Sequence, residues 1–361
     1  MNRHRATVAT LLAAALAGAT CLAATAAAEA STATVRATLA LGKWTSNLKM
    51  SPDGRFGYFP NDSDGTVSVL DTSTNQVTPV RVDQPGPTIF DVAISPDSRH
   101  VYAPDAKKIS VIDEATQSVS ATITVPDPPD TEAGLGILTG AVVSPDGHWL
   151  YVSQYGRSTQ DEVDNGRILV IDTATNQITG ETDLDFLLPV YLSIAPDGHE
   201  LYLSANGSGS LRLLDATSNP PTPAGTLAGR SGTGISVPLM DPVHNCGYVA
   251  GPGGVLDRLD LTTHALAQAL PAFGDGSGGI AITPDGTRMF LGHTGQDSVS
   301  VVDLNTGTLL DTVTGFGLTP ANSSFQSGLL VGNDSHTIYV SGGVGWMPPF
   351  ARDVLEVVTL P

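Results

Sequence analysis

The sequence lacks most of the features that mark the common classes of enzyme or stabilise small domains. It has two cysteines in 361 residues, so a disulfide framework is excluded as the main source of stability. Charged residues make up 15% of the chain, below the roughly 25% of an average soluble domain. It also lacks a G-x-S-x-G elbow, an H-E-x-x-H motif and a C-x-x-C pair. The usual hydrolase, metalloprotease and redox signatures are therefore missing.

Long amphipathic helical patterns are missing as well. Valine, threonine and isoleucine instead recur in short runs bounded by glycine, proline, asparagine and aspartate. The chain contains 39 glycines and 25 prolines, so turns are dense. This pattern predicts an all-β chain with many short strands.

The N-terminal segment differs in composition from the rest of the chain. A basic start is followed by small apolar residues over 6–27, and residues 28–30 fit an A-x-A cleavage site. We expect a Sec-type signal peptide over residues 1–30 and a secreted or periplasmic protein. Threonine and glycine interrupt the apolar stretch, which argues against a membrane span. A lipid anchor on Cys21 is a less favoured alternative, because threonine precedes it.

The net charge restricts the partners. Loss of residues 1–30 removes two arginines and Glu29, which changes the formal net charge from −19 to −20. Such a chain repels phosphate backbones and anionic lipid, so we expect no nucleic-acid partner. We expect a monomer that binds an unidentified protein or small-molecule ligand. Cys246 would be the single remaining cysteine, and its place at the start of an apolar strand predicts a buried structural residue.

One short motif recurs along the chain. A Ser-Pro-Asp-Gly sequence or a variant of it begins a unit every 42 to 51 residues, which is the spacing of WD40-like propeller blades with four strands each. Proline, aspartate and glycine in this order favour a hairpin turn. The seven copies are 51–54, 95–98, 144–147, 195–198, 241–244, 283–286 and 332–335, and the fifth and seventh are degenerate.

A second turn motif and the chain ends predict how the ring closes. An Asp-x-x-x-Asn-like turn follows the third strand of most units, as at 71–75 and 172–176. The last unit ends after its third strand, and residues 35–41 at the other end match the fourth strand of earlier units. We therefore expect the termini to share the seventh blade, which removes two exposed sheet edges. Residues 31–361 then form one seven-bladed domain of four-stranded antiparallel blades.

These repeats resemble the YVTN-type β-propeller repeat family, which is found in secreted and surface-exposed prokaryotic proteins. The resemblance covers residues 32–361 and is best in units 51–78 and 144–179. The name-giving tetrad survives in altered form at 151–154 and 339–342. The resemblance implies a propeller, a fold that hosts lyases, lactonases, cofactor binders and interaction modules. Some members bind DNA, and the charge of this chain argues against that role.

Candidate ligand residues follow from the expected topology. The repeated turns lie on one face of a propeller and the variable loops lie on the other, so we place a ligand site on the loop face near the central channel. One position per unit, three residues after the strand-two aromatic, would surround the channel mouth. It is occupied by Asn61, Asp105, Gln154, Ala205, Gly251, His293 and Gly342. The alternative is that each polar side chain caps its own loop.

Two long loops add further candidates. The loop 154–167 contributes Tyr155 and Arg157, and the loop 342–352 contributes Trp346 in an apolar, aromatic sequence. Trp346 and its neighbours would form a lid or partner contact, or fold over the channel. The carboxylates of the first loop and of residues 62–65 could bind calcium, although neither segment fits a complete calcium-binding motif. The favoured interpretation is a solvated acidic loop.

Three functional classes remain in consideration. The favoured one is an extracytoplasmic binding module without a cofactor. The alternative is a propeller enzyme, a lactonase-like hydrolase or a lyase, which would use a divalent metal or His293 as a base. The third is a redox-cofactor carrier similar to heme-binding propellers. Convergent metal ligands in the channel would favour the enzyme, and a coloured protein would favour the carrier.

Overall fold

The structure is a computed structural model. It describes residues 31–32, 34–42, 45, 47–61, 64–83, 89–126, 136–156, 165–186, 189–205, 210–228, 238–250, 256–270, 277–293, 298–316, 328–344 and 352–359. These residues form 29 β-strands joined by turns, with no helix among them. The expected signal peptide over residues 1–30 lies outside this part of the chain.

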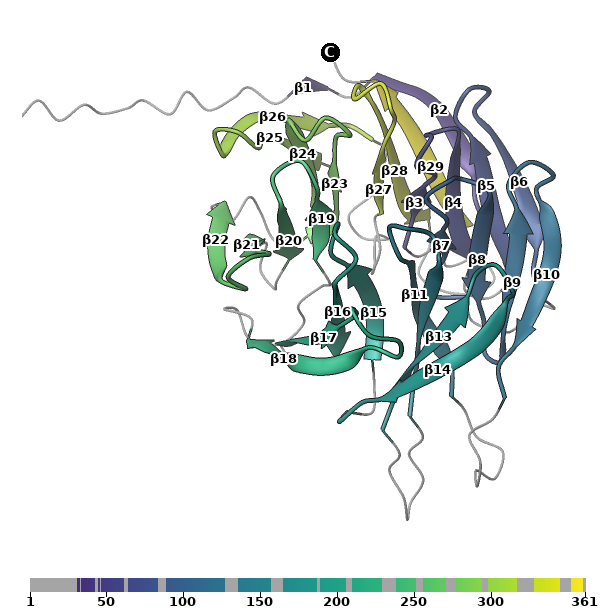
Figure 1. Cartoon of the computed structure of the whole chain (residues 1–361). Coiled ribbons are helices and arrows are strands. Elements are labelled where there is room, and N and C mark those ends of the chain that lie inside the picture. Colours follow the sequence, from purple (N-terminus) through teal and green to yellow (C-terminus); the bar gives the residue numbers. More distant parts are fainter. Residues whose placement is uncertain are drawn as a thin grey trace, which may run out of the picture.

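The strands form seven sheets, which we call blades 1 to 7 (Figure 1). Blade 1 contains β3 (Lys49–Met50), β4 (Phe56–Asn61), β5 (Thr66–Asp71) and β6 (Gln76–Arg81). Blade 2 contains β7 (Ala93–Ile94), β8 (His100–Pro104), β9 (Lys108–Asp113) and β10 (Ser118–Thr124). Blade 3 contains β11 (Leu138–Val143), β12 (Trp149–Gln154), β13 (Arg167–Asp172) and β14 (Gln177–Asp183). Blade 4 contains β15 (Pro189–Ile194), β16 (Glu200–Ala205), β17 (Ser210–Asp215) and β18 (Thr222–Ala228).

The remaining three blades include both ends of the described chain. Blade 5 contains β19 (Leu239–Asp241), β20 (Cys246–Ala250), β21 (Leu256–Asp260) and β22 (Leu266–Leu270). Blade 6 contains β23 (Ser277–Ile282), β24 (Arg288–His293), β25 (Ser298–Asp303), β26 (Thr308–Thr314) and the added β1 (Ser31–Thr32). Blade 7 contains β27 (Leu329–Val331), β28 (Thr337–Val344), β29 (Arg352–Thr359) and β2 (Thr34–Ala40).

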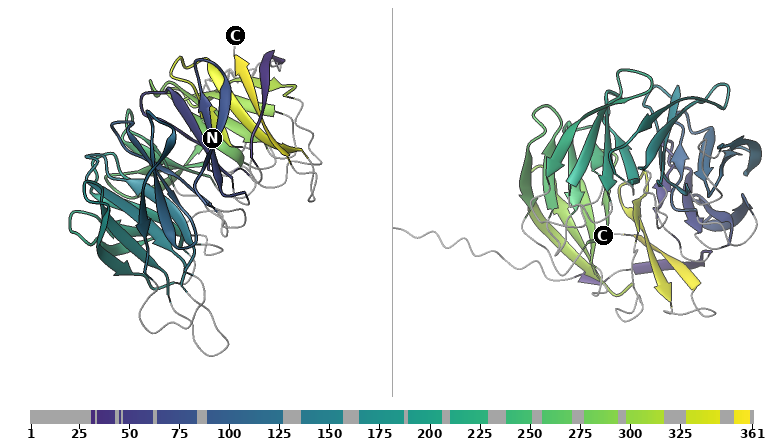
Figure 2. Two further views of the ribbon diagram at one scale, coloured as in Figure 1. Left: turned by 90° about the vertical axis from the view of Figure 1, so that its right-hand side faces the viewer. Right: turned by 90° about the horizontal axis from the view of Figure 1, so that it is seen from below.

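The blades are arranged in a ring, which the right-hand view of Figure 2 shows most clearly. Contacts between the first strands of successive blades run from β7 through β11, β15, β19 and β23 to β27, and β27 then contacts β3. The N-terminal strand β2 pairs antiparallel with β29, with Thr34 opposite Thr359 and Ala40 opposite Val354. The predicted seven-bladed ring, closed by a shared seventh blade, is confirmed.

Strand β1 adds a feature that the repeats did not predict. Ser31 and Thr32 pair in parallel with Val313 and Thr314 at the outer edge of blade 6. The N-terminal segment therefore contacts two blades in succession, since β2 follows it directly in blade 7. This short fifth strand covers part of an edge that would otherwise expose unpaired backbone groups.

Burial follows the position of a strand within its blade. The second and third strands are buried almost throughout, because each blade lies between two neighbours and both faces of these strands are covered. The fourth strands are largely exposed, as the pattern of β10 and β14 shows. The apolar Val-rich runs therefore fall on the inner strands and the polar alternation falls on the outer ones.

The hydrophobic core consists of seven clusters, each between two adjacent blades. Every cluster contains the aromatic residue of a second strand. These residues are Tyr58, Tyr102, Tyr151, Tyr202, Tyr248, Phe290 and Tyr339, all buried. Burial of large aromatic side chains supplies much of the hydrophobic free energy of such interfaces. The stability of the ring therefore depends on contacts between blades as well as within them.

The recurring turns are held by a network of side-chain hydrogen bonds. In blade 1, Ser51 Oγ donates to Asp53 Oδ1 at 2.8 Å and accepts from the backbone N–H of Phe56 at 3.0 Å. Asp53 Oδ1 also accepts from the backbone N–H of Arg55, and Gly54 has a φ of 72°, which glycine adopts without strain. The same arrangement recurs in the turns of blades 2 and 3. It explains why this short sequence is repeated.

The turn of blade 5 has a different construction from the one its sequence predicted. Asp241 Oδ1 accepts hydrogen bonds from the backbone N–H groups of Val243 and His244, and Asn245 has a positive φ of 49°. This is the geometry of the Asp-x-x-x-Asn turns, such as Asp71 with Asn75 at a φ of 57°. The turn lies where the repeat predicted it, but a second kind of Asp-based turn forms it.

Cys246 begins β20 and is fully buried in the cluster between blades 5 and 6. Burial raises the pKa of its thiol, which reduces the fraction of reactive thiolate. The residue is a free, buried cysteine, as the sequence predicted.

Candidate functional site

The predicted ligand residues lie where the second strand of each blade ends. Asn61, Gln154, Ala205 and His293 are the last residues of β4, β12, β16 and β24, and Asp105 follows β8. Gly342 lies within β28. Gly251, Arg157 and Trp346 lie outside the described residues, as do most residues of the two long loops.

Asn61 is fully buried and bonded to its own blade. Its Nδ2 donates to Thr66 Oγ1 at 2.8 Å and to Ser68 Oγ at 2.9 Å. Its Oδ1 accepts from Thr45 Oγ1 at 3.3 Å. The amide thus joins the loop before β3 to strand β5, so its hydrogen-bonding groups are used within the fold.

Asp105 is buried and lies beside a second acidic residue. Its Oδ1 accepts from the backbone N–H groups of Lys107 and Lys108, which caps the short loop into β9. The Lys108 ammonium lies 3.0 Å from Asp83 and 3.9 Å from Asp105. Burial and the nearby Asp83 raise the pKa of Asp105 to about 6, against the opposing effect of Lys107 and Lys108. The carboxyl group of Asp105 therefore titrates well above the usual range of an aspartate.

Gln154 joins two segments of blade 3. Its Nε2 donates to the Gly136 carbonyl at 2.8 Å, and its Oε1 accepts from Arg167 Nε at 2.7 Å. A Cβ atom at Gly136 would overlap the Gln154 side chain, which would have to shift to make room for it. Tyr155 follows it with its ring partly buried, and burial raises the pKa of the Tyr155 hydroxyl.

His293 is nearly buried and bonded to a serine. Its Nε2 lies 2.7 Å from Ser300 Oγ, and the two residues are 9% and 3% exposed. Asn61 and Ser68 occupy the same two positions in blade 1 and form the same contact. An amide cannot act as a base, so the shared geometry indicates a structural contact between strands two and three.

An ion pair between the partly exposed Lys49 and the buried Asp91 was not predicted from the sequence. Lys49 Nζ lies 2.8 Å from Asp91 Oδ1 and donates to the Ala141 carbonyl at 3.2 Å. Asp91 Oδ2 accepts from the Ala141 backbone N–H at 3.1 Å. Burial raises the pKa of Asp91, and Lys49 opposes this shift. The contact joins β3 of blade 1, the segment just before β7 of blade 2, and β11 of blade 3.

A sequence signal for this ion pair existed. Lys49 stands two residues before its Ser-Pro-Asp-Gly turn. The equivalent positions of the other blades hold uncharged residues, namely Ala93, Val142, Ser193, Leu239, Ala281 and Leu330. A single charge at a position that is otherwise uncharged marks a local interaction.

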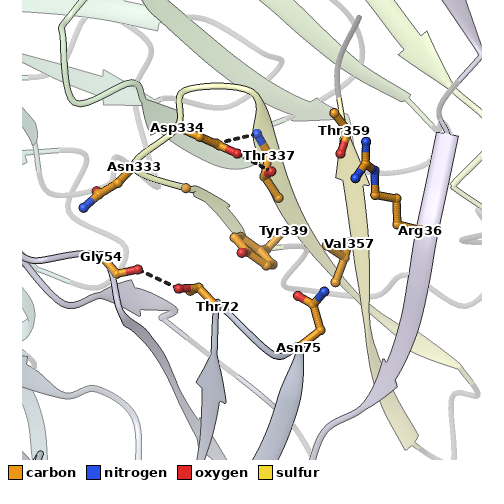
Figure 3. A pocket seen from close by; sticks show the side chains of 11 residues that line it. Arg36, Gly54, Thr72, Asn75, Asn333, Asp334, Thr337, Tyr339, Val357 and Thr359 are labelled. Carbon is orange, nitrogen blue, oxygen red and sulfur yellow. Dashed lines mark hydrogen bonds between the residues drawn. The ribbon is translucent and has the colours of Figure 1, made fainter.

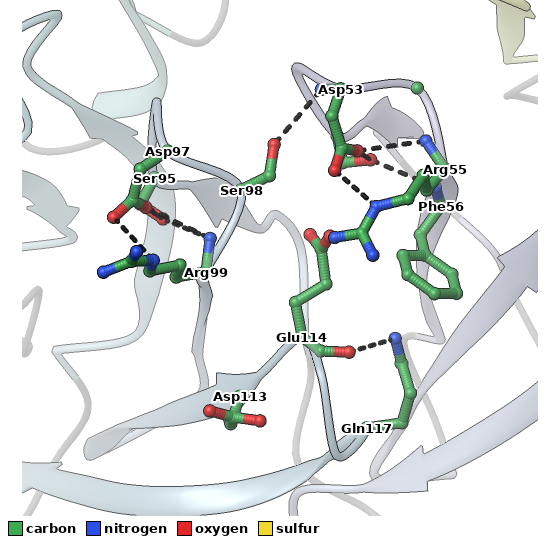
Figure 4. A network of polar contacts seen from close by, with 12 residues as sticks. Asp53, Arg55, Phe56, Ser95, Asp97, Ser98, Arg99, Asp113, Glu114 and Gln117 are labelled. Carbon is green, nitrogen blue, oxygen red and sulfur yellow. Dashed lines mark hydrogen bonds and ion pairs between the residues drawn. The ribbon is translucent and has the colours of Figure 1, made fainter.

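The repeated turns lie on the face of the propeller opposite the loop face. Here adjacent blades are joined by polar side chains (Figure 4). The Arg55 guanidinium in the turn of blade 1 lies 2.8 Å from the buried Glu114 of blade 2. Ser98 Oγ accepts from the Asp53 backbone N–H at 3.1 Å. Burial raises the pKa of Glu114, and Arg55 opposes this shift. This ion pair covers the inner aromatic Tyr58 between blades 1 and 2.

The corresponding space between blades 7 and 1 is open (Figure 3). Here a pocket of about 320 Å³ lies between the β27–β28 turn and β29 on one side and the two turns of blade 1 on the other. Its lining consists of Arg36, Gly54, Thr72, Asn75, Gly332, Asn333, Asp334, Thr337, Tyr339, Val357 and Thr359. We call it the seam pocket, because it lies where the ring closes.

Neither a metal cluster nor a membrane helix is found in the described residues. No group of three or more His, Cys, Asp or Glu residues among them could hold a metal ion. No helix in the described ranges is long and apolar enough to cross a membrane. The acidic residues 161, 162 and 164 of the loop 154–167 lie outside these ranges, and Asp64 caps its own turn through Thr66.

The seven four-stranded blades and the shared closing blade define the class of the protein as a seven-bladed β-propeller. No protein-family model matches the chain. A curated relative is the "Seven-bladed beta-propeller protein Rv1057" of Mycobacterium tuberculosis, which is 30% identical over 125 residues. That alignment covers 34% of this chain and 29% of the relative, so the chain matches under a third of the relative's length.

Two solved structures show the same fold at low sequence identity. A chain of Kuenenia stuttgartiensis hydrazine synthase superposes with a TM-score of 0.61 at 20% identity, covering 83% of this chain and 94% of that one. The Cps50 (Swd1) β-propeller domain of Myceliophteria thermophila gives a TM-score of 0.64 at 14% identity, covering 91% and 100%. At these identities the comparison establishes the fold alone.

Proposed function

We propose that this protein is an extracytoplasmic binding propeller, which presents its loop face near the central channel to a protein or small-molecule ligand and does not catalyse a reaction. The proposed location depends on the signal peptide expected over residues 1–30. The likeness of the repeats to the YVTN type agrees with it, because that family is found in secreted proteins. The proposal needs no bound cofactor.

The observation that carries the proposal is the shared contact of His293 with Ser300 and of Asn61 with Ser68. His293 was the candidate base of the alternative hydrolase. A base and nucleophile must reach a substrate, whereas both members of this pair are buried and an amide takes the same role in blade 1. The ligand surface would then be formed by the loops that extend beyond these positions, including Tyr155, Arg157 and Trp346.

Site-specific photo-crosslinking tests this function. A photo-reactive amino acid at Tyr155 on the loop face should give a specific adduct in the envelope fraction of the host. The same group at the exposed Thr74, on the turn face, is the matched control and should give none. Adducts only at Thr74 would contradict the assignment to the loop face.

A parallel assay tests the enzyme alternative. Purified protein is measured for metal content, for thermal stability with and without chelator, and for turnover of a simple γ-lactone. A stoichiometric divalent ion whose removal lowers the melting temperature, or turnover that the His293→Asn substitution abolishes, would replace the binding module with a propeller hydrolase.

A further inference from the structure

The turn positions above the seam pocket can be compared with those between blades 1 and 2. Between blades 1 and 2, Arg55 and Glu114 meet above Tyr58. At the seam, the residues at these two turn positions are His336 and Thr72, and the residue beneath them is Tyr339. These two residues cannot form the ion pair that Arg55 and Glu114 form, and the seam pocket lies beside Tyr339.

Blades 4 and 5 have a different bonded pair of side chains in the equivalent space. Between blades 4 and 5, His264 Nε2 lies 2.8 Å from Glu200 Oε1, and Tyr202 donates to Glu200 Oε2 at 2.6 Å. His264 occupies the turn position that Asn75 holds at the seam. The comparison within one chain thus shows that filling this space with charged, bonded side chains is compatible with the fold.

The polar groups of the seam pocket have free hydrogen-bonding capacity. Asp334 caps its own turn by accepting from the backbone N–H of Thr337 at 2.8 Å, and Thr72 Oγ1 donates to the Gly54 carbonyl at 2.8 Å. Within the described part of the chain, no hydrogen bond or ion pair involves the side chain of Arg36, Asn75 or Thr359 or the hydroxyl of Tyr339. Figure 3 shows Arg36 and Thr359 on one side of the pocket, with Tyr339 and Asn75 facing the same space.

These groups define a ligand chemistry. Arg36 offers a guanidinium fork that matches a carboxylate, and it is exposed on β2 at the edge of the pocket. The Asn75 amide and the two hydroxyl groups can each donate and accept, as alcohol groups require. The Tyr339 ring and Val357 provide apolar surface between them. The volume is at the lower end of the roughly 300–1,000 Å³ of small-molecule sites, which suits a ligand the size of a monosaccharide.

We propose that the seam pocket binds a small hydroxylated carboxylate, such as a sugar acid, with Arg36 on the carboxylate and Asn75, Tyr339 and Thr359 on the hydroxyl groups. The site lies on the turn face and is independent of the ligand proposed for the loop face. It draws its residues from the N-terminal strand, the first blade and the last blade, so it exists only when the ring is closed.

Calorimetric titration of the protein with glucuronate and with glucose tests the proposal. Glucuronate should bind at least tenfold more tightly than glucose, because only the acid can pair with Arg36. The Arg36→Gln variant, which changes an exposed side chain, should weaken glucuronate binding about tenfold and leave glucose unaffected. Equal binding of the two sugars, or no binding of glucuronate to the wild type, overturns the assignment.

A second variant closes the pocket with an ion pair that already occurs elsewhere in the ring. Thr72→Glu with His336→Arg places at the seam the pair that Glu114 and Arg55 form between blades 1 and 2, and it should abolish glucuronate binding. Thr173→Glu is the matched control. Thr173 holds the same turn position in blade 3 and bonds the Gly147 carbonyl, as Thr72 bonds that of Gly54. Unchanged binding in the folded double variant overturns the proposal.

Discussion

Thr38 and Glu356 lie 318 positions apart in the sequence, and the hydroxyl of Thr38 donates to the carboxylate of Glu356 at 2.9 Å and 3.0 Å. This contact lies in the pairing of β2 with β29. Around it, Leu39 and Ala37 of β2 pack into the cluster between blades 7 and 1, and Val35 packs into the one between blades 6 and 7. The N-terminal strand is therefore part of two inter-blade cores.

Deletion of residues 31–42 should strongly destabilise the protein. The seventh blade would lose its outer strand, several backbone hydrogen bonds and the apolar contacts of β2, for a loss of about 3 kcal/mol or more. Urea unfolding of a chain that begins at residue 31 provides the reference. Deletion of residues 31–33 removes only β1 and should cost far less. Equal stability of the two deletions would contradict the role of β2.

The serine of the repeated turn should contribute measurably to stability. Ser144→Ala removes a hydrogen bond to Asp146 and one from the Trp149 backbone N–H, and we expect a loss of about 1–2 kcal/mol. Blade 4 offers the reverse change, because Ala195 stands at this position beside Asp197. Ala195→Ser should gain stability by providing an acceptor for the Glu200 backbone N–H. Denaturant unfolding of both variants measures the change in the free energy of unfolding, which should fall for Ser144→Ala and rise for Ala195→Ser. A gain in stability from Ser144→Ala would refute this account.

Asp105 should make stability depend on pH in the range from about 4 to about 7. Its pKa is raised in the folded protein to about 6, from 3.8, so the folded state holds this proton more tightly than the unfolded state does. Its contribution is complete below about pH 4 and is lost as the pH rises through about 6. The Asp105→Asn variant should therefore lose less stability than the wild type over this range, by urea unfolding at several pH values.

The turn aspartates titrate in the opposite sense and at lower pH. Hydrogen bonds from Thr283 and Thr287 lower the pKa of Asp285 to about 2, so its contribution is present above about pH 4 and is lost as the pH falls. The pH range in which Asp285 titrates does not overlap with the range assigned to Asp105.

For the Asp105 prediction, Asp83→Asn is the control, since it removes a neighbouring carboxylate that contributes to the raised pKa of Asp105. A pH profile that is identical in Asp105→Asn and the wild type would exclude this source.

His293→Asn should preserve the fold, because Asn61 forms the same contact in blade 1. We expect a change of within about 1 kcal/mol, whereas His293→Ala leaves the buried Ser300 hydroxyl without this partner and should cost about 1–3 kcal/mol. Thermal and urea unfolding distinguish the two variants. Equal losses in both would mean that the contact with Ser300 does not stabilise the blade.

The fold could be predicted from the sequence because each blade repeats the same physical solution. Ser51, Asp53 and Gly54 each have a defined task in the turn, so their recurrence marked the blades, and residues 35–41 matched a fourth strand. The turn at Asp241 was assigned to the wrong type, because aspartate can organise both kinds of turn. The parallel pairing of β1 with blade 6 has no counterpart in the repeat and could not be predicted.

The sites were less predictable, because they depend on neighbours in space. The sequence pattern correctly identified Asn61, Asp105, Gln154 and His293 as equivalent positions at the end of the second strand. It did not predict that these side chains are buried. The partnership of Lys49 with Asp91 and the open space above Tyr339 arise between blades. They require knowledge of which turn of one blade faces which turn of the next.

The closing pair of strands also sets the order of events during synthesis. Strand β2 precedes the strands of blades 1 to 5 in the sequence, and its partner β29 follows the strands of all the other blades. Strand β2 therefore has to wait, unpaired, until β29 has been made. A nascent chain of this protein can form its early blades during synthesis, yet its ring can be completed only after β29 has emerged.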